Sequence, residues 1–202
     1  MTSTTAQAGL RERKKARTRA SLREHALRLF RERGYQETTV EQIAAAAEVS
    51  PSTFFRYFPT KEDVILRDDL DVRMIDAFSR QPASLAPVAA IRAATKEALA
   101  SFDLADLAQI QETTRLTLTV PEIRARAIDE FSRTIGVLAE AFGKRVGRSP
   151  DDVALRTLAG AVVGVIMSVT LPWDKQSPER PVEEMFASID KALALLEAGL
   201  PI

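Results

Sequence analysis

Apolar residues recur at spacings of three and four along most of the chain, which is the period of amphipathic α-helices. The first such stripe predicts a helix from about residue 10 to a C-cap at Gly34, with an apolar face made of Leu22, Ala26, Leu29 and Phe30. The sequence shows no alternation typical of half-buried strands. The pattern therefore predicts an all-α fold of about nine helices.

Two short helices joined by a tight turn are predicted over residues 39–58. The first begins with a capping box, because Thr39 is followed three residues later by Gln42 and each side chain can satisfy a backbone N–H of the helix start. Glu48 and Val49 form the turn. The apolar face of this helix consists of Val40, Ile43, Ala44 and Ala47.

The second short helix has an aromatic inner face and a polar outer face. Ser50 is its expected N-cap, and Pro51 suits its first position. Phe54 and Phe58 are four residues apart and are expected to pack inward together, before Pro59 ends the helix. The outer face then carries Ser52, Phe55 and Arg56, with Tyr57 on the flank. This pattern suits the second helix of a helix-turn-helix, which lies in a DNA major groove; an ordinary surface hairpin is the alternative.

Six further helices are predicted after Thr60, the expected N-cap of the next helix, whose first turn contains Asp63. They cover residues 61–79, 88–102, 103–117, 121–142, 151–171 and 182–199. The expected organisation is a disordered tail at 1–9, a helix-turn-helix domain at 10–60 and a second helical domain at 61–202.

The segment 151–171 is the most apolar part of the chain, and no charge occurs from Thr157 to Trp173. This uncharged run contains two glycines and a proline and falls short of the ~20 apolar residues that a membrane span needs. A buried helix is therefore expected, with no membrane partner. Gly160 and Gly164 are four residues apart and permit close approach of another helix.

The distribution of charge divides the chain. Residues 1–60 contain 11 Lys/Arg and 6 Asp/Glu, whereas residues 61–202 contain 17 and 22, although the net charge is zero. A basic N-terminal third attached to an acidic remainder is typical of a DNA-binding domain joined to one that does not bind DNA.

Metal and cofactor chemistry finds no support in the sequence. The chain has no cysteine and a single histidine, His25, so thiolate and histidine metal sites are not expected. Asp68, Asp69 and Asp71 do not share one helical face and are interpreted as solvated. No phosphate loop or nucleophile motif is present, so the prediction is a non-enzyme without metal or cofactor, in a cytoplasmic setting.

From about Thr18 to Val64 the chain resembles the DNA-binding domain of TetR-family transcriptional repressors. The resemblance rests on the order TTV-x-x-IA-x-x-A-x-VS-x-x-TFFRYFP-x-KE-x-V, preceded by A-L-x-L-F-x-E-x-G-Y. The resemblance implies a double-stranded DNA operator as partner. It places DNA contacts at Thr39, Ser52, Thr53, Phe55, Arg56, Tyr57 and Lys61, with Arg17 in a basic arm that precedes the helical stripe and reaches the minor groove or the phosphates.

The roles implied by this resemblance follow from side-chain chemistry. Thr39 and Lys61 are expected to hold phosphates, and Tyr57 is expected to reach a phosphate through its hydroxyl. Arg56 suits a bidentate contact to guanine, and Phe55 suits a thymine methyl group. Ser52 and Thr53 are short enough for base edges or phosphates. Where the family usually has glycine in the turn, this chain has Glu48, which is strained if the turn needs a positive φ.

For the second domain, the resemblance implies a pocket for a small-molecule effector and a homodimer that binds a pseudo-palindromic operator and leaves it when the effector binds. The helices at about 151–171 and 182–199 resemble the family's dimerisation pair; completion of a monomer core is the alternative. The segment RLTLTVPEIRAR resembles a subgroup with an acyl-CoA-like ligand domain. The candidate pocket residues are Met74, Phe78, Phe102, Arg115, Phe131, Ile135 and Met167.

Two other functions remain open at this point. An architectural DNA binder without an effector would use the second domain only to dimerise, and its affinity would depend on salt rather than on sequence. If the protein were a small helical enzyme or carrier, removal of Arg56 and Lys61 would leave its activity unchanged.

Overall fold

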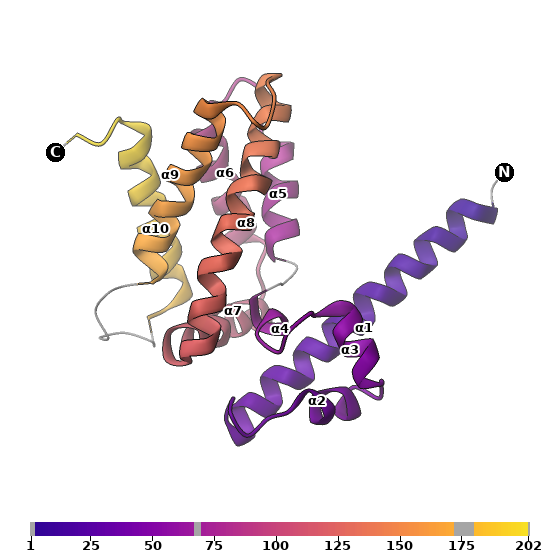
Figure 1. The fold of residues 1–202 in the computed structure, drawn as a ribbon. Helices are drawn as coiled ribbons and strands as arrows, with labels where there is room; N and C mark the ends of the chain where they lie inside the picture. The colour runs from indigo at the N-terminus through magenta and orange to yellow at the C-terminus, as the bar shows by residue number, and fades with distance from the viewer. Residues whose placement is uncertain (1–2, 67–69, 172–179, 202) are drawn as a thin grey trace. The chain divides into compact units, whose positions relative to one another are not determined.

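The computed structural model describes residues 3–66, 70–171 and 180–201, and these residues form ten helices and no strand (Figure 1). The predicted all-α class is therefore confirmed. The helices are α1 (Ser3–Arg33), α2 (Val40–Ala46), α3 (Pro51–Tyr57), α4 (Asp63–Leu66), α5 (Leu70–Arg80), α6 (Pro87–Ala100), α7 (Leu104–Thr119), α8 (Pro121–Val146), α9 (Val153–Thr170) and α10 (Val182–Glu197).

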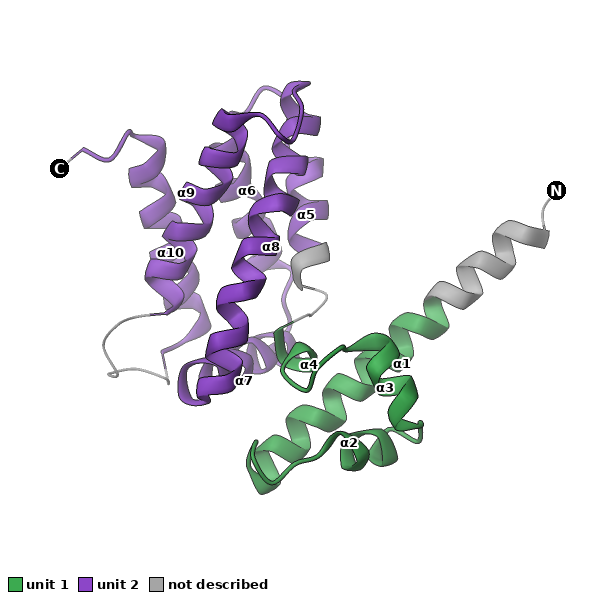
Figure 2. Cartoon of the chain, in the orientation of Figure 1, with its two compact units in different colours: residues 1–67 green, residues 68–202 purple. Residues whose placement is uncertain are grey.

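The chain divides into two compact units, residues 1–67 and residues 68–202 (Figure 2). The division falls later than the expected boundary after Thr60, because α4 packs against α1 and belongs to the first unit. The predicted helix at 61–79 corresponds to α4 and α5; residues 67–69, which include Asp68 and Asp69, lie outside the described residues.

The first helix begins at Ser3, where the sequence predicts a disordered tail over residues 1–9. Ala and Gln, two good helix formers, occur in this stretch and allow the helix to continue toward the N-terminus. The helix ends as predicted at Gly34, whose φ of 86° lies in the left-handed region that glycine adopts without strain.

The core of the first unit is the apolar face that the spacing of residues predicts. The four stripe residues of α1 are all buried, as are Ile43 of α2, Phe54 of α3 and Ile65 of α4. The predicted caps are also present: the Thr60 hydroxyl accepts from the Asp63 backbone N–H (3.2 Å), and the Asp63 carboxylate accepts from that of Thr60 (3.2 Å).

The turn between α2 and α3 requires a backbone conformation that favours glycine. Glu48 has a φ of 56°, so the strain expected if the turn needs a positive φ is present. The turn is closed by the backbone N–H of Val49, which donates to the Ala44 carbonyl at 2.9 Å. At the start of α2, the Thr39 hydroxyl accepts from the Gln42 N–H at 3.2 Å, and the Gln42 side-chain oxygen accepts from the Thr39 N–H at 3.0 Å, which confirms the capping box.

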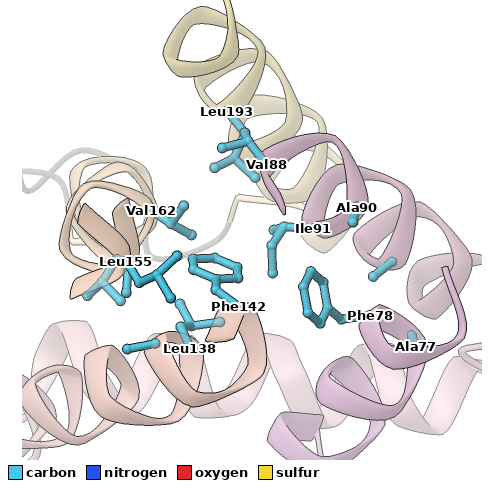
Figure 3. Close-up of a cluster of buried hydrophobic side chains, with 14 of the residues drawn as sticks. Ala77, Phe78, Val88, Ala90, Ile91, Leu138, Phe142, Leu155, Val162 and Leu193 are labelled. Carbon is cyan, nitrogen blue, oxygen red and sulfur yellow. The ribbon is translucent and has the colours of Figure 1, made fainter. Parts of the chain in front are cut away.

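The core of the second unit gathers side chains from five helices, α5, α6, α8, α9 and α10 (Figure 3). Phe78 of α5 and Phe142 of α8 meet edge to face at its centre, with ring centroids 5.6 Å apart. The guanidinium of Arg145 lies 5.2 Å from the Phe78 ring centroid and donates to the carbonyls of Leu85 (3.1 Å), Gln81 (3.3 Å) and Pro82. Arg145 thereby ties the loop between α5 and α6 to α8.

The apolar helix α9 is buried on one face only, whereas its composition predicts burial all round. Leu155, Ala159, Val162 and Val163 face the core, but Val153 is 79% exposed and only 22% of the helix is buried. By length and composition α9 would also pass as a membrane span, yet it packs against α8 and α10 within the second unit. The side of α9 that carries Val153, Thr157, Gly164 and Ser168 is exposed, and Leu158, Val165, Ile166, Met167 and Val169 are only partly buried against the core.

We predict that Glu48→Gly stabilises the first unit by about 1 kcal/mol, because glycine relieves the left-handed strain at a cost in chain entropy that is smaller than the relief. Glu41→Gly is the matched control: Glu41 is also exposed but lies within α2, so glycine there should destabilise by about 0.5–1 kcal/mol. The measurement is urea unfolding followed by circular dichroism. Equal destabilisation by both substitutions would contradict the strain argument.

Candidate functional site

Helix α3 is anchored by Phe54 and Phe58, both fully buried. Their ring centroids lie 5.7 Å apart, in agreement with the predicted inward pairing. The guanidinium of Arg19, from α1, lies 5.4 Å from the Phe58 ring centroid and adds a cation–π contact. The Ser50 hydroxyl accepts from the Thr53 N–H at 3.2 Å, which confirms the predicted N-cap. These contacts fix which side of α3 faces away from the core.

The outer face of α3 presents the side chains that the sequence predicts. Ser52, Phe55 and Arg56 are exposed, Phe55 to 49%, and Tyr57 is half-buried on the flank. The Arg56 guanidinium lies 5.4 Å from the Tyr57 ring centroid. The hydroxyls of Ser52 and Thr53 lie 2.8 Å and 3.0 Å from the N-cap hydroxyl. The short helix α3, which is held by its buried phenylalanines, thus presents an exposed aromatic ring, a guanidinium and two hydroxyls.

The other predicted contact residues fall into two groups. Thr39 is exposed at the N-terminus of α2, and Arg17 is exposed on α1. Lys61 is half-buried, and its ammonium donates to the backbone carbonyls of Tyr35 and Thr38, each at 3.0 Å. The structure therefore gives Lys61 partners within its own unit that the sequence pattern does not reveal.

The basic segment before the apolar stripe is helical. Arg13, Lys14, Lys15 and Arg17 are all exposed on α1. A helix with side chains is roughly 10–12 Å across, whereas the minor groove of B-DNA is only about 6 Å wide. In this conformation, the segment suits contacts to phosphates rather than insertion into a minor groove.

The second unit contains a cavity of about 160 Å³. Its walls are mainly aliphatic, and its polar side chains are two threonines and one arginine. Because the hydroxyl of Thr95 donates to the Ile91 carbonyl (2.9 Å) and that of Thr134 to the Glu130 carbonyl (3.0 Å), both hydroxyls retain only acceptor capacity. The lining residues are Met74, Ile75, Ile91, Thr95, Arg133, Thr134, Val137, Leu138, Val162, Ile166, Ile189 and Leu193.

Of the seven predicted pocket residues, Met74 lines this cavity and the other six do not. Phe78 belongs to the packed core with Phe142, and Phe102 meets Phe186 edge to face with ring centroids 6.1 Å apart. Phe131, Ile135 and Met167 are partly buried against the core. The missed lining residues show only ordinary helical spacing, such as Ile91 with Thr95, which does not distinguish a cavity wall from packed core.

Arg115 is engaged by its neighbour Glu112. Its Nε and Nη2 donate to the two Glu112 carboxylate oxygens at 2.8 Å and 2.7 Å. This bidentate hydrogen bonding raises the pKa of Arg115 above its usual value. Among the described residues, no group of three or more His, Asp or Glu side chains is placed to hold a metal ion.

An ion-pair cluster joins two walls of the cavity. Ile91 of α6 and Ile189 of α10 line the cavity, and their neighbours Arg92 and Asp190 form a salt bridge with Nε 2.9 Å from Oδ1. Arg92 also donates to Glu197 at 2.6 Å, and Lys96 lies 3.2 Å from Asp190. The hydrogen bond from Arg92 lowers the pKa of Asp190 below its ordinary value of 3.8.

Two sequence profiles together match most of the chain. Residues 22–67 match the profile described as bacterial regulatory proteins, tetR family, and residues 85–201 match that of the MftR C-terminal domain. The fold and the outer face of α3 thus define a helix-turn-helix transcriptional regulator with a second helical domain. The chain belongs to the TetR family of bacterial regulatory proteins.

Individual relatives agree with this assignment. The transcriptional regulator TcmR of Streptomyces glaucescens is 37% identical over 151 residues, which cover 71% of this chain and 67% of TcmR. The mycofactocin biosynthesis regulator MftR of Mycobacterium tuberculosis is 24% identical over 188 residues, covering 88% of this chain and 90% of MftR.

Solved structures show the same fold. Thermus thermophilus FadR, a TetR-family repressor in complex with lauroyl-CoA, has a TM-score of 0.56 and 28% identity, with 91% of this chain and 95% of FadR covered. A TetR-family regulator of Syntrophomonas wolfei has a TM-score of 0.60 at 19% identity, with coverage of 92% and 97%.

We predict that Asp190→Asn destabilises the second unit at about pH 7 and that this effect fades in acid. Since the folded-state pKa of Asp190 is depressed, its contribution is present above 3.8 and is lost as the pH falls through the lower folded-state value. The measurement is urea unfolding of wild type and variant between about pH 7 and pH 2. Asp151→Asn, at an exposed carboxylate, is the control. A difference between wild type and Asp190→Asn that does not change with pH would contradict the assignment.

Proposed function

We propose that this protein is a ligand-responsive repressor that binds a pseudo-palindromic DNA operator as a homodimer and leaves it when a small, largely apolar effector binds. The observation that carries the proposal is the outer face of α3, where Phe55 and Arg56 stand exposed on a helix anchored by two buried phenylalanines. Because the protein acts on DNA, its site of action is the cytoplasm.

For DNA, the proposed contacts divide into base readers and phosphate ligands. Arg56 reads guanine through two hydrogen bonds, and Phe55 packs on a thymine methyl group. Ser52 and Thr53 touch base edges or phosphates at the start of α3. Thr39, Tyr57 and Arg17 hold phosphates and fix the register of the helix. The exposed residues Arg13, Lys14 and Lys15 of α1 add affinity that is independent of sequence and sensitive to salt.

For the dimer, the proposed interface is the uncovered face of α9 together with α10. Gly160 and Gly164 of α9 have nothing within 4 Å of an added Cβ, so the close approach that they permit is available to a second copy. On α10, Leu195 is 45% exposed. Apolar faces of two adjacent helices suit a four-helix bundle made by two subunits.

For the effector, the proposed site is the aliphatic cavity of the second unit, and an acyl chain suits its walls. Lauroyl-CoA in FadR supports an acyl-CoA-like ligand. Ligand and DNA must prefer different conformers, and such coupling is typically ~1–3 kcal/mol. Helix α5 carries Met74 and Ile75 into the cavity wall and follows the DNA-binding unit in the chain, so it is the proposed lever.

Selection of bound sites from random duplex DNA, at near-physiological salt, tests this function directly. We expect enrichment of a pseudo-palindrome, since a symmetric dimer reads two half-sites. Salt-sensitive binding without any enriched sequence would instead indicate an architectural DNA binder.

We predict that Arg56→Ala weakens operator binding by about 1–3 kcal/mol and relaxes the preference at one base pair of each half-site. Titration of the selected operator and of its single-base variants measures both effects. Arg31→Ala, at an exposed arginine of α1 outside the proposed contacts, should leave base preference unchanged. Unaltered affinity and preference in Arg56→Ala would show that the base-reading assignment is wrong.

We predict that lauroyl-CoA releases the protein from its operator and that Val137→Phe weakens this response at least about tenfold, because the larger side chain occupies part of the cavity. Ile128→Phe, at a 52% exposed position of the same helix, is the control and should respond as the wild type does. Lauroyl-CoA titrations without saturation and without any effect on DNA binding would refute the acyl-CoA-like effector.

A further inference from the structure

Lys61 stands out among the predicted DNA contacts because its charged end is held inside its own unit. Its Nζ donates to the Tyr35 and Thr38 carbonyls, both at 3.0 Å, and lies 3.9 Å from the centroid of the Tyr35 ring. An ammonium group has three N–H donors. Two are used on carbonyl oxygens, and the electron-rich face of a buried tyrosine occupies a further side.

The two carbonyls belong to the loop that joins α1 to α2, residues 34–39. Within this loop, the buried Thr38 hydroxyl lies 2.8 Å from the Gly34 carbonyl, and Thr39 begins the capping box of α2. Lys61 reaches this loop from the segment between α3 and α4, more than twenty residues later in the chain. It therefore joins the start of the helix-turn-helix to the segment that follows its end.

The surroundings of Lys61 reinforce this link. The Tyr35 hydroxyl donates to the carboxylate of Glu62, the residue next to Lys61, and the Tyr35 ring packs against Phe30 with centroids 5.1 Å apart. Burial raises the pKa of Glu62, but hydrogen bonds from Tyr35, the Glu62 backbone and Thr60, with the charge of Lys61, outweigh it and lower the pKa overall. The Glu62 carboxylate thus binds the hydroxyl of Tyr35, and the Lys61 ammonium binds its backbone carbonyl and ring face.

We propose that Lys61 is a positioning residue for operator recognition, which fixes the loop 34–39 and through it the setting of α2 and α3, rather than a ligand of DNA phosphate. This inference rests on the proposed DNA-binding function. A phosphate contact would require the ammonium either to give up its place over the Tyr35 ring or to leave two carbonyls that lie in a partly buried setting, where unpaired acceptors are costly. Sequence-independent affinity then depends on exposed cations such as Arg17.

The test compares Lys61→Met with the wild type on two duplexes, the selected operator and a scrambled sequence, over a range of salt concentrations. If Lys61 positions the helices, Lys61→Met lowers operator affinity at least about tenfold more than scrambled-duplex affinity, and the salt dependence stays unchanged. If Lys61 binds phosphate, both affinities fall together and the salt slope decreases by about 0.9 per subunit, which overturns the proposal. Arg17→Gln is the control that should show the phosphate pattern.

Lys61→Gln provides a second variant that removes the charge but keeps two N–H donors on its amide. We expect Lys61→Gln to retain more operator selectivity than Lys61→Met, with an unchanged salt slope. Loss of folding stability in either variant without loss of operator selectivity, measured where the variant is folded, would show that Lys61 has a purely structural role and would also overturn the proposal.

A measurement without DNA separates this inference from the proposed function. Amide hydrogen exchange of Lys61→Met should be faster than in the wild type at residues 34–40, with exchange in α9 unchanged. Unchanged exchange at 34–40 overturns the positioning role even if the operator is never found. Failure of the wild-type protein to select any duplex refutes the DNA-binding function and leaves the exchange result as the test of Lys61.

Discussion

The first unit of this protein depends on the burial of two aromatic rings, one within the seven-residue helix α3 and one at its C-cap. A helix as short as α3 is not stable alone in water, so its position comes from tertiary contacts. Phe54 and Phe58, the latter with Arg19 over its ring, supply those contacts and leave the opposite side of the helix exposed. The side chains of the exposed side are therefore free to vary without moving the helix, while the buried side keeps the helix in place.

Much of the first unit could be predicted from sequence because its signals are local. The capping box at Thr39, the cap at Ser50 and the Phe54–Phe58 spacing each involve residues within four positions, and each is found in the structure. The strain at Glu48 is equally local. By contrast, the partners of Lys61 lie 23 and 26 residues away, and no helical period or turn signal connects them.

The cavity escaped prediction for a physical reason of the same kind. Large aromatic side chains are natural candidates for a ligand wall, yet Phe78 packs against Phe142 in the core and does not border the cavity. Which residues border a void depends on where five helices leave a gap, and that is a property of their packing rather than of any one stripe. The exposed side of α9 shows a second limit of sequence-based prediction. Composition indicates how apolar a helix is, but not whether other helices of the same chain cover it.

The composition of the cavity wall has a mechanical consequence. Six of its apolar residues, Ile75, Ile91, Val137, Val162, Ile166 and Ile189, are valine or isoleucine, and these β-branched side chains are restricted to essentially one χ1 rotamer in helices. Met74 is the one lining side chain with an unbranched, freely adaptable thioether. A ligand too large for the space therefore meets walls that yield little by changing rotamer at these six positions, and beyond what Met74 and the other unbranched or leucine side chains can accommodate it must displace the helices. Because these side chains are stiff, a bulky ligand would shift the backbone of the lining helices rather than rearrange their side chains. A shift of a whole helix, unlike a change of rotamer, can be transmitted to other helices.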